Sequence, residues 1–156
     1  SNFNGAVYRS SDNGENWVKV SDGLNPQFDF TTLASLGNNL FAGSFAGVFV
    51  SDNAGESWIS VVSGLSNTLV NSLATSGNNL FAGTYGGVFI SSDNGNSWVE
   101  KNPGLTDIIV NTLAASEKQL FAGTFSRSVF SIFGAVIATR FHSFKKIFFS
   151  IFFNQF

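Results

Sequence analysis

Apolar and polar residues alternate along most of the chain in short runs, which is the spacing of β-strands rather than of helices. The clearest example is the segment 70–101, where VNSLATS, NLFAGTY, GVFISS and SWVEK are each bounded by residues that favour turns. Gly77 and Asn78 separate the first two runs, and both residue types adopt the positive φ that a tight hairpin needs. We therefore predict antiparallel strands at 70–76, 79–85, 87–92 and 97–101.

The same pattern repeats along the chain with a period of about forty residues. Trp17, Trp58 and Trp98 are 41 and 40 residues apart, and the sequence LFAG recurs at Leu40 and Leu80 and again at 120. A period of this length marks repeated supersecondary units. A four-stranded antiparallel meander of this size is one blade of a β-propeller. Helical periodicity is not sustained before residue 131.

This spacing assigns the chain to the all-β class, as a partial β-propeller of about three blades. Two segments supply complete blades, one supplies only the last two strands of a blade, and one supplies the first two strands, with a third left open. The segments are, in that order, 31–62 and 70–101, then 5–20, then 110–131. Closed propellers typically have four to eight blades. We expect either a fragment of a larger propeller or self-association through the open blade edges.

A polar loop with the spacing S-x-D-x-G-x-x-W follows the third strand of each repeat. The Asp carboxylate of such a loop can accept backbone N–H groups two residues on, the Gly supplies a positive φ, and the Ser hydroxyl caps the loop. The Trp begins the next strand, where we expect its ring to pack between neighbouring sheets. The loop residues are Ser10, Asp12, Gly14 and Trp17; Ser51, Asn53, Gly55 and Trp58; and Ser91, Asp93, Gly95 and Trp98.

One of the three loops departs from the pattern, because Asn53 stands where the others have Asp. An amide oxygen can make the same turn but adds no charge. We expect this hairpin to form and to be the weakest of the three.

The loop pattern resembles the Asp-box, or BNR repeat, of sialidases, sortilin-type receptors, xyloglucan-active glycosidases and photosystem II assembly factors. The resemblance covers residues 5–130 in three in-phase copies, and it implies a β-propeller. In that family the loops lie away from the ligand face, so the resemblance implies a structural role for them. It also implies an extracellular or periplasmic location, although the first residues show no basic start followed by an apolar run.

The pattern ends near residue 131, which divides the chain into incomplete Asp-box blades, 1–131, and a basic tail, 132–156. Eight of the 25 tail residues are Phe. Their spacing fits a helix that docks on the propeller edge or on a membrane surface, and their composition equally fits read-through of A/T-rich codons after a frame change. Charges at 140–146 leave apolar stretches below the ~20 residues of a membrane span, so we expect none.

Composition narrows the function classes. The net charge is −2 and only 12% of residues are charged, so there is no electrostatic footprint for nucleic acid. The chain has no Cys, and its one histidine, His142, lies in the tail. We therefore expect no metal site, no cofactor and no Ser–His–acid triad.

Glycoside hydrolysis generally needs two carboxylates across the scissile bond. Asp29 and Asp107 lie near the loops that join blades, but two blades apart, and the Arg-Ile-Pro motif of sialidases is absent. Outside the Asp-boxes the acidic candidates are Asp22, Asp29, Glu100, Asp107 and Glu117, and the arginines Arg9, Arg127 and Arg140 are scattered. We expect no catalysis by this chain alone.

The turns opposite the Asp-boxes are the candidate ligand face, because rigid scaffolds carry function on loops. An aromatic residue recurs there at Phe45, Tyr85 and Phe125, and Arg127 breaks the Gly pattern of its turn. The rings either stack on a sugar or peptide or pack beneath the central rim, which is the interpretation that the sequence favours. We expect a non-catalytic scaffold or binding module for carbohydrate or protein. The alternative is a fragment of a propeller glycoside hydrolase whose catalytic residues lie elsewhere.

Overall fold

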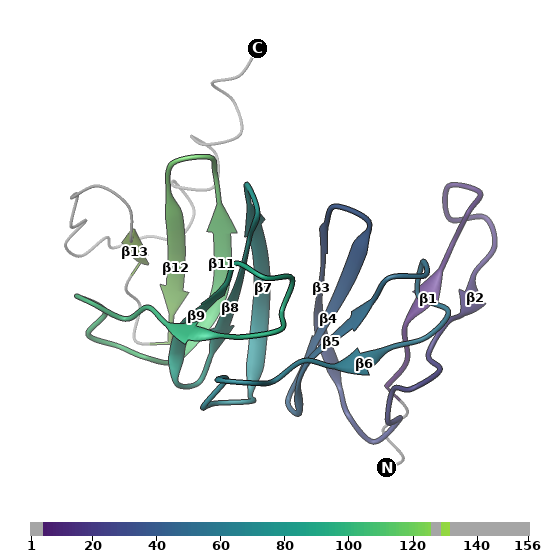
Figure 1. The fold of residues 1–156 in the computed structure, drawn as a ribbon, viewed down its shortest axis with the longest axis horizontal. Coiled ribbons are helices and arrows are strands. Elements are labelled where there is room, and N and C mark those ends of the chain that lie inside the picture. Colours follow the sequence, from purple (N-terminus) through teal and green to yellow (C-terminus); the bar gives the residue numbers. More distant parts are fainter. Residues whose placement is uncertain (1–4, 126–128, 132–156) are drawn as a thin grey trace.

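The computed structural model describes residues 5–125 and 129–131, which form four antiparallel sheets standing side by side (Figure 1). The strands are β1 (Tyr8–Arg9), β2 (Val18–Lys19), β3 (Phe30–Leu36), β4 (Asn39–Ser44), β5 (Gly47–Ser51), β6 (Ile59–Ser60), β7 (Val70–Ser76), β8 (Asn79–Thr84), β9 (Gly87–Ser91), β10 (Val99–Glu100), β11 (Val110–Ala115), β12 (Leu120–Thr124) and β13 (Val129–Ser131). No helix occurs in this part of the chain, and the tail 132–156 lies outside it. Among the same residues there is no helix long and apolar enough to cross a membrane.

The sheets confirm the all-β, partial-propeller prediction. Two of them are complete four-stranded meanders, β3-β4-β5-β6 and β7-β8-β9-β10. The sheet β1-β2 holds two strands, and β11-β12-β13 holds three, so the third strand that the sequence left open is present. In the β7–β8 hairpin Ser76 faces Asn79, and Gly77 has a φ of 56°, as the two-residue turn requires.

The fourth strand of each full sheet is shorter than predicted. Strand β10 covers only Val99–Glu100 instead of 97–101. The reason is that the Trp98 N–H leaves the ladder and donates to Ser63 O, 2.9 Å away in the loop that follows the preceding sheet. Trp58 makes the same bond to Asp22 O at 2.9 Å. Each outer strand is therefore tied to the preceding sheet as well as to its own.

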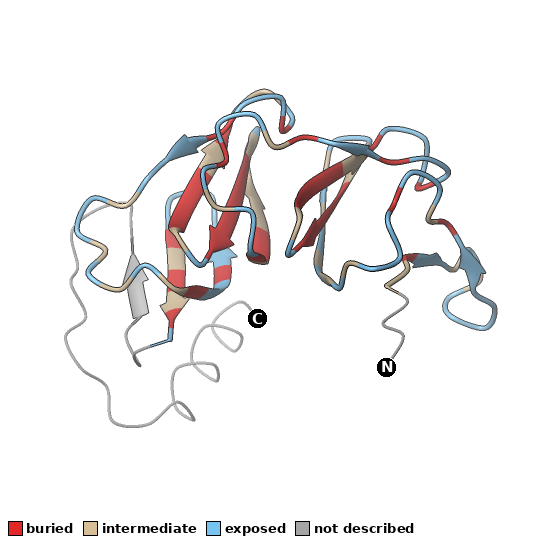
Figure 2. Ribbon diagram, turned by 90° about the horizontal axis from the view of Figure 1, so that it is seen from below, coloured by how far each residue is buried: buried red, intermediate tan, exposed pale blue. Residues whose placement is uncertain are grey.

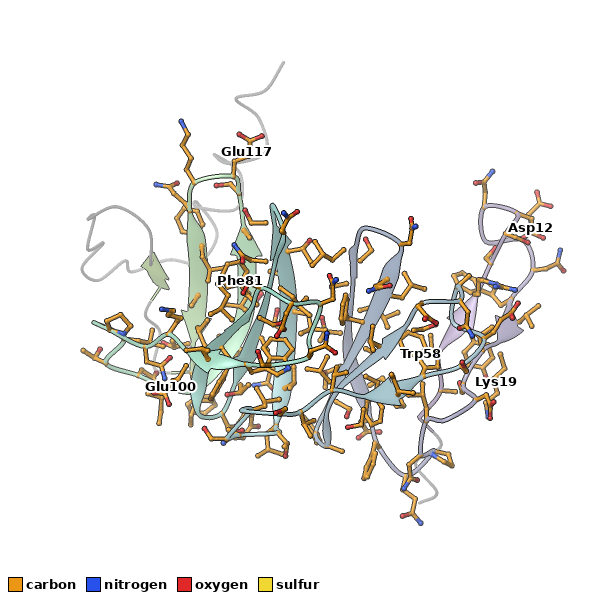
Figure 3. The ribbon with its side chains drawn as sticks, viewed as in Figure 1. Asp12, Lys19, Trp58, Phe81, Glu100 and Glu117 are labelled. Atoms are coloured by element: carbon orange, nitrogen blue, oxygen red, sulfur yellow. The ribbon has the colours of Figure 1, made fainter. Side chains whose placement is uncertain are left out.

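Two of the Asp-box tryptophans, Trp58 and Trp98, are buried in the contacts between neighbouring sheets. Trp58 and Trp98 are each 3% exposed, and Figure 3 shows Trp58 between its own sheet and β1–β2. Their Nε1–H groups donate to Val20 O at 2.9 Å and to Val61 O at 2.8 Å, both in the preceding repeat. The prediction for Trp17 is wrong, because its ring is 61% exposed. No preceding sheet lies beside it in the described part of the chain.

The glycine of LFAG lets the inner strands of neighbouring sheets approach closely. A Cβ on Gly43 would lie 2.9 Å from Val70 and 3.5 Å from Leu73, which belong to the next sheet. Leu73 is 7% exposed as a result. Buried residues gather in β4, β5, β7, β8 and β9 of the two full sheets, while their fourth strands, β6 and β10, are exposed (Figure 2). Some loop residues are also buried, among them Trp58, Val61 and Trp98. The core therefore lies between blades rather than within one sheet.

We predict that Trp98→Ala lowers the free energy of unfolding by about 3–5 kcal/mol, because it leaves a cavity between two sheets and removes the bond to Val61 O. Ile59→Ala is the matched control, since Ile59 is 66% exposed and should cost less than about 0.5 kcal/mol. Urea denaturation of both variants measures the difference. Equal losses would show that the ring does not carry the contact between blades.

Candidate binding face

The Asp-box loops close on their own backbone. In the third copy, Ser91 Oγ accepts the Gly95 N–H at 2.8 Å and donates to Asp93 Oδ1 at 2.8 Å. The Asp93 carboxylate accepts the Ser97 N–H at 2.9 Å, four residues on rather than the predicted two. Both Asn94 and Gly95 have positive φ, 58° and 86°, which carries the chain around the tight loop. The polar groups of the motif therefore form their hydrogen bonds within the turn itself.

The second copy makes the same network with an amide. Asn53 Oδ1 accepts from Ser51 Oγ at 2.8 Å and from the Ser57 N–H at 2.9 Å, while its Nδ2 donates to Ser57 Oγ at 2.8 Å. Ala54 has a φ of 58° in this loop, where the other copies have Asn13 and Asn94. A left-handed conformation costs an ordinary residue roughly 1–2 kcal/mol. The Asn that recurs at this position in the other two copies indicates a positive φ, and the sequence analysis missed this signal.

Hydrogen bonding holds the Asp-box carboxyls ionised. The pKa of Asp12 is lowered from 3.8 to about 2, first by the Asn16 side-chain amide, then by the Asn16 N–H and the Ser10 hydroxyl. The pKa of Asp93 is lowered by the Ser97 hydroxyl, the Ser97 N–H and the Ser91 hydroxyl, in that order. Each donor stabilises the charged form, which is what lowers a pKa.

The acidic side chains do not gather. Among the described residues no three groups of the kind His, Cys, Asp or Glu lie close enough to hold a metal ion. Asp12 and Glu117 lie at the edge that carries the Asp-boxes, whereas Glu100 lies on β10, where its Oε1 accepts a hydrogen bond from Asn102 Nδ2 at 2.8 Å (Figure 3). Asp107 Oδ1 accepts the Ile109 N–H at 3.2 Å. The predicted acids are therefore distributed over different edges and loops.

The opposite edge carries the recurring aromatic rings. Phe45 and Tyr85 are each 43% exposed and Phe125 is 71% exposed, so all three side chains are partly open to solvent. Arg127 lies outside the described residues. Two further apolar side chains are exposed in the blade-joining loops beside them, Leu69 at 37% and Ile108 at 50%.

Buried hydroxyls hold these turns in place. Ser44 Oγ accepts the Ala46 N–H at 3.0 Å, and Thr84 Oγ1 accepts the Gly86 N–H at 2.9 Å. The Tyr85 N–H donates to Leu69 O at 3.1 Å, which ties the turn to the loop that enters the same sheet. Both hydroxyl residues are fully buried. The sequence analysis missed them, although Ser or Thr follows every LFAG.

Comparisons with known proteins show the fold. No family model and no curated protein matches the sequence. Among solved structures, an ancestral GH74 enzyme is 22% identical with a TM-score of 0.65, over 85% of this chain and 20% of that chain. The extracellular domain of a hybrid two-component system from B. thetaiotaomicron is 14% identical with a TM-score of 0.65, over 86% of this chain and 20% of that chain. YCF48 bound to D1 peptide is 20% identical with a TM-score of 0.58, over 78% of this chain and 42% of that chain.

This chain thus spans about a fifth of the first two proteins and less than half of the third. The likenesses confirm the fold that the Asp-box resemblance implied. The chain is a partial β-propeller whose blades carry Asp-box loops.

We predict that Asp12 makes the stability of the fold against unfolding depend on pH in the acidic range. Because its pKa is lowered in the fold, its contribution is complete above the ordinary value of 3.8 and is lost as the pH falls toward about 2. The Asp12→Asn variant copies the natural Asn53 loop and cannot titrate, so its melting temperature should fall less between these pH values. Thermal unfolding of both proteins across this range measures the effect. Parallel curves would contradict it.

Proposed function

We propose that this chain is a non-catalytic β-propeller module that binds a carbohydrate or protein ligand as part of an extracellular protein. The observation that carries the proposal is the exposed aromatic ring at the same turn of three successive blades, Phe45, Tyr85 and Phe125. Aromatic rings are ordinarily buried, whereas these three are exposed at the edge opposite the Asp-boxes. Loops on a rigid scaffold are the usual place for a binding site.

The turns suit recognition because they are already ordered. Ser44 and Thr84 fix their backbones from below, so a ligand would not have to order these turns when it binds. Tyr85 presents an apolar face with a polar hydroxyl, which can stack on a sugar ring or a peptide group. Leu69 and Ile108 extend the apolar surface between the rings.

The solved structures with this fold support both ligand classes. One is a GH74 enzyme, and one is YCF48 bound to D1 peptide. An extracellular location is supported by the B. thetaiotaomicron structure, which is an extracellular domain.

A second candidate function is that the chain is one part of a propeller glycoside hydrolase. The likeness to an ancestral GH74 enzyme, of which the chain covers 20%, favours it. In that case the catalytic carboxylates lie in other blades, because the acids of the described residues occupy separate edges and loops. A longer polypeptide with those blades would hydrolyse glycosides, whereas the module proposed above would bind without turnover.

We predict that Phe45→Ala and Tyr85→Ala each weaken ligand binding by about fivefold, because a stacked ring contributes about 1 kcal/mol. A panel of neutral oligosaccharides and a random peptide library identify the ligand, and calorimetry measures its affinity for each variant. Ile59→Ala is the control, because Ile59 is exposed on β6 away from the turns. Unchanged affinity in both ring variants, or hydrolysis of an aryl-glycoside by the chain, would contradict the proposal.

A further inference from the structure

The third Asp-box contains a chemically labile pair of residues, Asn94 followed by Gly95. Asparagine before glycine is the pair in which the side-chain amide is lost most readily. The reason is that glycine has no side chain to hinder its own backbone nitrogen from reaching the amide carbon of the asparagine. Asn94 is exposed to solvent at the tip of the loop. Sequence and exposure together make this position a candidate for deamidation.

The reaction joins two atoms that the backbone already holds near each other. The Gly95 nitrogen gives its proton to water or hydroxide and attacks Asn94 Cγ, and Nδ2 takes a proton from solvent and leaves as ammonia. The product is a cyclic succinimide. Water then opens either carbonyl of this ring, which gives aspartate in one case and isoaspartate in the other. The net change consumes a water molecule, releases ammonia and needs no oxidant or reductant.

The turn explains why these two residue types stand here. Asn94 and Gly95 have φ angles of 58° and 86°, which Asn and Gly adopt more readily than other residues. In the second Asp-box the same two positions are Ala54 and Gly55, with φ angles of 58° and 88°. That loop has the same backbone without a side-chain amide, so it cannot undergo the reaction. The chain therefore contains its own inert counterpart of the labile loop.

The closed loop holds the attacking nitrogen in a hydrogen bond. The Gly95 N–H donates to Ser91 Oγ at 2.8 Å. This hydroxyl is 1% exposed and belongs to the serine that defines the motif. An N–H bound in this way is harder to deprotonate, and the nitrogen reaches Asn94 Cγ only after the bond breaks.

Burial adds to this protection. Gly95 is buried, and a Cβ on it would lie 3.1 Å from Val61 and 3.3 Å from Phe41, both in the preceding repeat. Water and hydroxide are therefore kept from the Gly95 N–H while the loop lies against the preceding sheet. The asparagine side chain is in solvent, whereas the nitrogen that must attack it is not.

We propose that Asn94 is a deamidation site that the Asp-box protects while it is closed, with the Ser91 hydroxyl as the protecting group. Folded proteins open locally at lower free energy than they unfold as a whole. Each opening of this loop exposes the Gly95 nitrogen to an irreversible conversion. Modification at Asn94 therefore records how long this part of the blade has been open.

The isoaspartate product does not fit the closed loop. It carries the main chain through the side-chain carbons of position 94, which lengthens the backbone between Ser91 and Gly95. The hydrogen bond between these two residues depends on that spacing. Trp98 follows in the same loop and is 3% exposed between the two full sheets. A loop that cannot close therefore weakens the contact between the sheets.

Peptide mapping by mass spectrometry tests the protection. The folded chain and the same chain unfolded in guanidinium chloride are kept in a mildly alkaline buffer, and conversion of Asn94 to aspartate and isoaspartate is followed over time. Conversion should be about a hundredfold slower in the folded chain, because the loop must open before the nitrogen can attack. Equal rates in the folded and unfolded chains would overturn the proposal.

Ser91→Ala tests the protecting group. It leaves the Gly95 N–H without its acceptor, so Asn94 should convert about tenfold faster in the folded chain. Ser51→Ala is the matched control, because Ser51 Oγ accepts the Gly55 N–H at 2.9 Å in the second Asp-box. The control removes the same kind of bond from another loop and should leave the rate at Asn94 unchanged. Equal acceleration in both variants, or acceleration in neither, would overturn the role of the Ser91 hydroxyl.

The isoaspartate form, separated by chromatography, tests the consequence for the fold. It should melt at a lower temperature than the unmodified chain. Asn94→Asp is the matched control, because it adds the same charge without lengthening the main chain, and it should melt close to the unmodified protein. Equal melting temperatures of the isoaspartate form and Asn94→Asp would overturn the inference that the modified loop cannot close.

Discussion

The structure depends on one contact, made by the tryptophans that end the second and third Asp-boxes, Trp58 and Trp98, which lie on the preceding blade. Each ring fills the space between two sheets, its Nε1–H binds a carbonyl of the preceding repeat, and its own backbone N–H binds another. The tryptophan side chain and its backbone N–H both bind the preceding repeat. The residue that ends the Asp-box turn therefore also fixes how its own sheet packs against the preceding one. Stability is therefore shared between neighbours, as in other repeat proteins.

The polar residues of the Asp-box prepare that contact. Serine and aspartate close the loop, and the residues with positive φ turn the chain so that the tryptophan leaves it toward the preceding blade. Their hydrogen bonds are internal, which explains why the low pKa of Asp12 marks a folded turn and not a reactive group. A strongly shifted pKa is a sign of function only where it lies in a cleft with a free reaction partner.

The two edges of each blade consequently have different roles. One edge is occupied by the Asp-boxes and their internal bonds, and the opposite edge is free to vary. There the buried hydroxyls of Ser44 and Thr84 keep the turns ordered while Phe45 and Tyr85 remain exposed. The same repeat therefore carries closed polar loops at one edge and ordered turns with exposed rings at the other, and the strands between them are alike.

The period of forty, the strand order and the loop positions could be predicted from the sequence, because they follow from local alternation and turn chemistry. The exposure of Phe45, Tyr85 and Trp17 could not, because burial depends on what lies across from a residue in space. Trp17 and Trp98 have the same local motif, yet one is exposed and the other buried. Sequence by itself determined the blade, whereas only the tertiary structure decided which surfaces of the blades are covered, since a sheet's neighbour is set by packing between repeats forty residues apart.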